Sequence, residues 1–233
     1  MLAEATVVDL MIDAQTAARE IHGPDFYTAH ESSLTSAPAR FQAAAMASAS
    51  AVVAYSEWLE ACGNTFNLVS RAGLNPVRPK KEIAAVCEDL LRRIRQYASA
   101  AEQCAAAAKA ATQCALLGPQ ATSDECNFPE GATRTALLKL TECPELRYVR
   151  EISDALNDRE LLDATPSEHL RDGLSFPAMA AADTNWPPKS VNKFVGYEWE
   201  QQVDVYRSLF QALNQDLAAP GLLPRGALQG INT

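Results

Sequence analysis

Two long stretches of the chain place apolar or small residues at alternating steps of three and four positions, and this pattern constrains the fold most. In residues 38–72 the stripe comprises Phe41, Ala45, Ser48, Val52, Tyr55, Leu59, Cys62, Phe66 and Val69. In residues 79–117 it comprises Ile83, Cys87, Leu90, Ile94, Tyr97, Ala101, Cys104, Ala108, Ala111 and Ala115. A mean spacing of 3.5 residues is typical of α-helices that supercoil around a neighbour. The pattern therefore predicts two long helices that pack side by side.

The two stripes also match each other when the chain folds back on itself. The residue numbers of opposed positions then add up to 149, as for Leu59 with Leu90 and for Tyr55 with Ile94. Half of this sum falls in residues 73–78, a segment rich in Gly, Asn and Pro, which end helices. We therefore expect an antiparallel hairpin with a short turn, roughly 50 Å long at 1.5 Å per residue.

Turn-forming residues and helical spacing mark out the remaining elements. We expect the second long helix to begin at Pro38, with Thr35 or Ser36 as its N-cap, because proline suits a first helical turn. Residues 25–37 then form a connection. Further helices are expected at residues 3–21, 132–141, 145–162 and 189–218, and a loop-rich segment at 166–188.

The C-terminal helix, residues 189–218, carries a bulky apolar face suited to covering the seam of the hairpin. This face comprises Val195, Trp199, Val203, Tyr206, Phe210, Leu213 and Leu217. In the hairpin itself, alanine dominates the seam from Ala101 onward, which leaves room for extra layers at the end away from the turn. The sequence thus predicts an all-α protein: one elongated domain, residues 1–233, with a hairpin and a third long helix.

Composition narrows the classes of function. The net charge is −9 and the sequence pI is about 4.9, which argues against nucleic acid or anionic lipid as the main partner. We expect no membrane span, since no run of ~18 apolar residues occurs. The first residues lack the basic region of a signal or transit peptide, so any targeting signal or lipid anchor is expected to lie outside this chain.

Six cysteines make an even count, and two of them, Cys62 and Cys87, face each other in the hairpin register. We predict a disulfide between these two, stabilising by roughly 3–4 kcal/mol through the unfolded chain. For the other four the preferred pairing is Cys114 with Cys126 and Cys104 with Cys143. The alternative is that the thiols are reduced and packed in the core.

Motifs of catalysis and of cofactor binding are not found, and the three histidines lack the spacing of a zinc site. We therefore expect neither an enzyme nor a cofactor. A basic cluster lies at and below the hairpin turn: Arg78, Lys80, Lys81, Arg92, Arg93 and Arg95. Together with Asn75 in the turn, its first three residues form a candidate surface for an acidic partner. The alternative is a solvated face whose cations pair with Glu82, Glu88 and Asp89.

A long hairpin with an alanine-rich seam, a facing cysteine pair and a third long helix resembles the helical surface proteins of trypanosomes. These include the invariant and alanine-rich coat proteins and several small receptors. The residues that carry the resemblance are the two stripes, Cys62 with Cys87, and the Val195–Leu217 face. The resemblance implies an elongated bundle on a lipid anchor that offers its distal end to the host.

We weigh three hypotheses of function. The first is an extracellular or cell-surface bundle, coat-like or receptor-like, that binds a protein through its distal surface. The second is a structural subunit of a larger mitochondrial, ciliary or other intracellular assembly, with reduced thiols. The third is an enzyme or cofactor carrier with an unrecognised site in the bundle core. The number of free thiols separates the first two hypotheses.

Overall fold

The computed structural model describes residues 2–72, 77–118, 131–157, 175–176, 179–181, 184–186, 189–191 and 193–219; the side chains of 2, 64–72, 77–83, 150, 153–157 and 175–189 are not described. The chain divides into two compact units, and α2, α3, α5 and α7 contribute to both. Unit 1 comprises Met1–Ala43, Glu102–Leu146 and Gln202–Thr233, and unit 2 comprises Ala44–Ala101 and Arg147–Gln201. The expectation of one elongated domain stays a prediction.

The described elements are almost entirely helical. The helices are α1 (Leu2–His22), α2 (Pro24–Ala72), α3 (Val77–Leu117), α4 (Ala132–Thr141), α5 (Pro144–Asn157), the π-helical turn η4 (Lys193–Tyr197) and α7 (Glu198–Ala218). The predicted span of α4 is confirmed, whereas the last helix was expected to begin nine residues before Glu198. The segment predicted as loop contains short strands, so that prediction is wrong in part. β1 (Ser175–Phe176) pairs with β4 (Lys189–Ser190), and β2 (Met179–Ala181) pairs with β3 (Thr184–Trp186), both antiparallel.

Helix α2 begins 14 residues before the predicted start at Pro38, because its packing outweighs the cost of an internal proline. Phe26, Leu34 and Ala37 are buried and continue the apolar stripe into the segment that we expected to be a connection. Thr35, an expected N-cap, instead hydrogen-bonds back to the carbonyl oxygen of Glu31 at 2.7 Å within the helix. Burial of the stripe thus carries the helix through a residue that usually ends or starts one.

The proline inside α2 leaves one backbone carbonyl without its helical donor, and α1 supplies a replacement. Pro38 has no N–H, so the carbonyl oxygen of Leu34, four residues earlier, receives no bond from within the helix. The Nε2 of Gln15 donates to this oxygen at 2.9 Å. A side chain from α1 therefore satisfies the group that the proline orphans, which makes the interior proline tolerable.

The core of unit 1 also includes the junction of α1 and α2. Gly23 adopts a φ of 84° between these helices. Just before it, His22 donates through Nε2 to the carbonyl oxygen of Ala115 at 2.8 Å, which caps the last turn of α3. α3 ends at Leu117, and the next residue, Gly118, has a φ of 55°, in the left-handed region. The ends of these helices are thus tied together by one imidazole.

The predicted face of α7 is confirmed, since all seven of its apolar residues are buried. In unit 1, Tyr206 of α7 meets Phe41 of α2 edge to face, with ring centroids 5.6 Å apart. In unit 2, Trp199 lies 6.4 Å from Tyr97 of α3. Ser48 of α2 donates to the carbonyl oxygen of Val195 at 3.0 Å. In each unit the chain leading into α7, or α7 itself, therefore packs on the helical pair, as expected.

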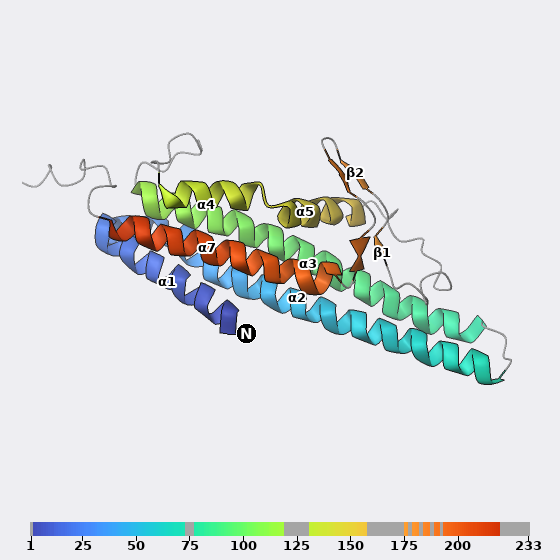
Figure 1. Ribbon diagram of the computed structural model, residues 1–233. Helices are drawn as coiled ribbons and strands as arrows, with labels where there is room; N and C mark the ends of the chain where they lie inside the picture. The colour runs from blue at the N-terminus through green and yellow to red at the C-terminus, as the bar shows by residue number, and fades with distance from the viewer. Residues whose placement is uncertain are drawn as a thin grey trace, which may run out of the picture. The chain divides into compact units, whose positions relative to one another are not determined.

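In each unit α2 runs antiparallel to α3 (Figure 1), so the hairpin is confirmed, but the buried stripe of α2 differs in part from the prediction. The predicted stripe of α3 is buried at every position from Leu90 to Ala115. In α2 the buried stripe contains Ala44, Ala51 and Trp58. The predicted stripe contains the next residue in each case: Ala45, Val52 and Leu59. Each of the three buried residues is followed by a second apolar residue, so helical spacing alone did not distinguish the two stripes.

Two side-chain hydrogen bonds link α2 to α3. Arg40 donates to Gln103 at 2.6 Å in unit 1, and Arg93 donates to Ser50 at 2.7 Å in unit 2. Leu90 is fully buried whereas Leu59 is 46% exposed, and the predicted contact between these two residues stays a prediction.

Candidate protein-interaction face

Helix α2 presents an apolar surface to solvent in unit 2. Of the seven large hydrophobic side chains that are exposed in the described part of the chain, four belong to α2: Met46, Val52, Val53 and Leu59, with exposed fractions of 74%, 39%, 52% and 46%. Single exposed apolar residues are common, but a cluster on one element marks a surface that contacts something else. We call these four residues, with Ala45, Ala49 and Ser56 between them, the α2 face.

Helical geometry orders the α2 face into lines. Positions seven apart lie nearly two full turns apart and share one side of a helix. Ala45, Val52 and Leu59 form one line, and Met46 and Val53 form another, with Ala49 and Ser56 between the two lines. Met46 and Val53 are the more exposed of the large side chains within their turns, so their line forms the crest of the face.

The face is bounded along the chain by charge. No charged residue occurs between Arg40 and Glu57, a run of 16 uncharged positions in a chain where 21% of residues are charged. Glu57 and Glu60 then follow, both exposed. An exposed helical surface normally carries charges that keep it in water, so an exposed apolar surface over this run is unusual.

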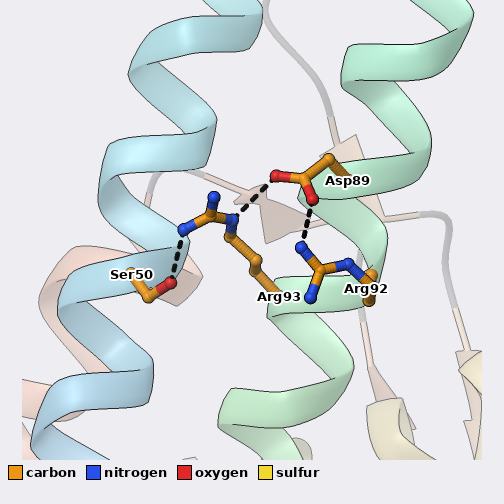
Figure 2. Close-up of polar contacts among 4 residues, drawn as sticks. All are labelled: Ser50, Asp89, Arg92 and Arg93. Atoms are coloured by element: carbon orange, nitrogen blue, oxygen red, sulfur yellow. Dashed lines mark hydrogen bonds and ion pairs between the residues drawn. The ribbon is translucent and has the colours of Figure 1, made fainter.

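A cluster of charged groups borders the α2 face on the side of α3 (Figure 2). Asp89 pairs with both Arg92 and Arg93 of the same helix, and the Nε of Arg93 lies 2.7 Å from Oδ2 of Asp89. The hydrogen bonds from Arg92 and Arg93 lower the pKa of Asp89. Through Nη1, Arg93 also donates to the hydroxyl of Ser50 on α2 at 2.7 Å. Its guanidinium is therefore held against the edge of the face.

This cluster corresponds to the alternative that the sequence left open for the basic residues. Arg92 and Arg93 pair with Asp89, one of the acidic residues considered there. Of the predicted partner-binding residues, Asn75 lies outside the described part of the chain. Arg78, Lys80 and Lys81 belong to the first turns of α3, but their side chains are not described. Their proposed role stays a prediction.

The described cysteines are all free thiols: Cys62, Cys87, Cys104, Cys114 and Cys143. The predicted disulfide between Cys62 and Cys87 is therefore not formed in this structure. The predicted Cys104–Cys143 bridge is likewise not formed, and Cys126 lies outside the described residues.

Burial keeps these thiols protonated. It raises the pKa of Cys104 to about 12, although a hydrogen bond with Tyr206 opposes the rise, and it raises the pKa of Cys114 and of Cys143 to about 11. The pKa values of Cys62 and Cys87 are also raised, mainly by burial. Because the thiolate is the reactive form, these cysteines behave as small apolar core residues at neutral pH.

In the described part of unit 2, a buried acidic residue lies near aromatic rings. Glu198 at the start of α7 is 2% exposed. Burial, and secondly the charge of Glu198, raise the pKa of Tyr148. Phe194 contacts both Tyr148 and Tyr97 edge to face. Among the described residues, no group of three or more His, Cys, Asp or Glu side chains is arranged to hold a metal ion.

Sequence reasoning missed the α2 face, although a signal was present. The hydrophobic residues at 52, 53 and 59 were assigned to the seam or left unassigned, and the run without charge was not used. Adjacent apolar pairs such as Val52–Val53 cannot both point into one seam. An uncharged helical stretch with apolar residues beyond those that the seam needs therefore predicts a second contact surface.

Within the described part of the chain, no helix is long and apolar enough to cross a membrane. No family model, no curated protein and no solved structure matches this chain.

Proposed function

We propose that this chain is a non-enzymatic helical protein that works by binding another protein, with the α2 face as its contact surface. The observation that carries the proposal is the exposure of Met46, Val52 and Val53 within a helical run of 16 residues without charge. Such a surface gains free energy when a partner removes it from water, at about 25 cal/mol per Å² of apolar area. Exposed charges at its edges then set the orientation of the partner.

The α2 face replaces the tip of the hairpin as the preferred contact surface within this proposal. Its side chains come from a helix that is buried on its other side by Ala51, Ala54 and Trp58, so the surface stands on a packed scaffold. Contact surfaces on rigid elements lose little conformational entropy on binding. A role for the basic residues near residue 78 in binding an acidic partner is a separate proposal.

A photo-crosslinking amino acid at position 53 tests the proposed function in cells that express the chain. The matched control is the same group at position 138, since Leu138 of α4 is 50% exposed and lies in unit 1. We expect a discrete crosslinked protein adduct from position 53 and none of the same mass from position 138. Equal, diffuse labelling from both positions would contradict a binding role for the α2 face.

The setting in which the protein binds its partner has two candidates. In the first, the chain is an extracellular or cell-surface protein, coat-like or receptor-like, as the resemblance to trypanosome surface bundles implies. An even number of cysteines and an acidic composition support this setting. In the second, it is a structural subunit of a larger intracellular or organellar assembly. The five free thiols of the described residues favour the second setting.

Counting thiols in protein isolated under alkylating conditions separates the two settings. The protein is unfolded without reductant after free thiols have been blocked, and its mass gives the number of blocked cysteines. Six blocked cysteines support the intracellular assembly and contradict the surface setting. No blocked cysteine supports the surface setting, and peptide mapping then gives the disulfide pairs, including whether Cys62 joins Cys87.

A further inference from the structure

We infer that the partner of the α2 face is a second copy of this chain, packed antiparallel across a two-fold axis near Val53. This inference rests on the proposed function, because it names the partner for the same surface. It is carried by the distribution of charge along the two ends of the face. A surface that binds a copy of itself must be complementary to itself after a two-fold rotation.

The charges beside the α2 face have opposite signs at its two ends. Arg93, held by Ser50 and Asp89, places a cation beside the level of residue 50. Glu57 lies seven positions beyond Ser50, so it occupies the same side of the helix almost two turns further on. Glu57 is exposed, and it forms no ion pair with another described residue. Along the edge of the face nearest α3, the cation of Arg93 is therefore followed by the anion of Glu57.

Consider the α2 helices of two copies lying antiparallel in one plane, with a two-fold axis perpendicular to that plane at the level of Val53. This axis brings the charged edges of the two α2 faces together. Such a rotation places the edge nearest α3 in one copy beside the same edge of the other copy. Residue 49 of the second copy then lies at the level of Glu57, one residue or about 1.5 Å from the level of its Ser50. Glu57 of each copy therefore approaches Arg93 of the other, which forms two symmetric ion pairs.

The antiparallel direction follows from the same charges. In a parallel pair Glu57 would face Glu57 and Arg93 would face Arg93, which places like charges together at both ends. The centre of the face suits close packing in either direction, because Ala49 and Ser56 are small and flank Val53. Charge thus selects the antiparallel copy, while the apolar crest of Met46 and Val53 supplies the buried area.

Sedimentation equilibrium of the full chain from about 1 to 200 μM tests the inference. We expect the mass to rise from the monomer value of 25.2 kDa toward twice that value. Val53→Arg should weaken self-association at least tenfold, whereas Leu138→Arg, at an equally exposed apolar site on α4, should leave it unchanged. Far-UV circular dichroism confirms that both variants are folded, as expected for substitutions at exposed positions.

A charge-swap pair tests the antiparallel arrangement itself. Glu57→Arg and Arg93→Glu should each weaken association by at least fivefold, because each homodimer then contains two like-charge pairs. An equimolar mixture of the two variants should recover a dimer, since the mixed pair restores opposite charges at both contacts. A purely structural role for either residue would not produce this recovery.

Two results would overturn the inference. One is a folded wild-type chain that stays monomeric at 200 μM. The other is a dimer that neither Val53→Arg nor the charge-swap variants change. Both leave the proposed function to be decided by the crosslinking experiment, where an adduct of a different protein at position 53 would support binding without self-association.

Discussion

The interior proline of α2 allows a sharp test of how α1 and α2 are joined. Gln15→Met keeps the length of the side chain but removes the donor that bonds the carbonyl oxygen of Leu34. Leu34 is 1% exposed, so this oxygen would be left largely without a partner. An unsatisfied buried polar group costs about 1–3 kcal/mol. We therefore expect Gln15→Met to lower the free energy of unfolding by that amount.

The cost of Gln15→Met should depend on the presence of Pro38. Pro38→Ala restores a backbone N–H that bonds the carbonyl of Leu34 from within α2. In the Pro38→Ala background, Gln15→Met should therefore cost about 0.5 kcal/mol or less, and the two substitutions should show a coupling energy of about 1–2 kcal/mol. Additive effects, with a coupling below about 0.3 kcal/mol, would refute the proposed replacement of the missing donor.

Urea denaturation followed by far-UV circular dichroism measures all four proteins of this cycle. For a chain of this size the single substitution corresponds to a loss of about 2–12 °C in Tm, at about 2–4 °C per kcal/mol. Thr16→Ala is the matched control, because Thr16 sits next to Gln15 but bonds only the carbonyl of Ile12 within α1, at 3.0 Å. It should cost no more than about 0.5 kcal/mol in either background.

Three further predictions concern the cores. Gly118→Ala should destabilise the fold by about 1–3 kcal/mol, because the φ of Gly118 is 55° and an added Cβ would lie 2.6 Å from Nδ1 of His22. Thermal melting measures this loss, and the loss should be smaller in a His22→Ala background. Ser48→Ala should cost about 1–2 kcal/mol in urea denaturation because it leaves the carbonyl of Val195 without that donor. Burial raises the pKa of Cys104 from an ordinary value of 9.0 to about 12 in the folded protein. The free energy of unfolding should therefore be constant below pH 9 as far as this thiol is concerned, and should fall by about 4 kcal/mol as the pH rises toward 12. Cys104→Ala should reduce this dependence of the unfolding free energy on pH.

Sequence periodicity predicted most of the helical framework. The stripe of α3 from Leu90 onward and the stripe from Val195 through α7 were assigned correctly, because large side chains such as Ile94, Tyr97 and Phe210 recur at helical spacing. Helix α4 was also placed correctly, since Gly131 precedes it and Cys143-Pro144 follows it. Where the pattern was unambiguous, local spacing and helix-ending residues were sufficient.

The errors have physical causes that lie outside local sequence. Pro38 was interpreted as a helix start because nothing nearby shows that Gln15, 23 residues earlier, replaces the missing donor. The seam of α2 was displaced because Val52 and Leu59 follow Ala51 and Trp58, and two adjacent apolar positions compete for one line. The displaced seam is also why the α2 face was missed.

The central claim is that α2 is buried along Ala51 and Trp58 and exposed along Val52 and Val53. The most direct measurement compares the free energies of unfolding of Ala51→Glu and Val52→Glu, two identical changes at adjacent positions, at low protein concentration. We predict that Ala51→Glu costs at least about 3 kcal/mol or prevents folding, while Val52→Glu costs less than about 1 kcal/mol. Equal costs, or a larger cost at Val52, would contradict both the packing of α2 and its exposed face.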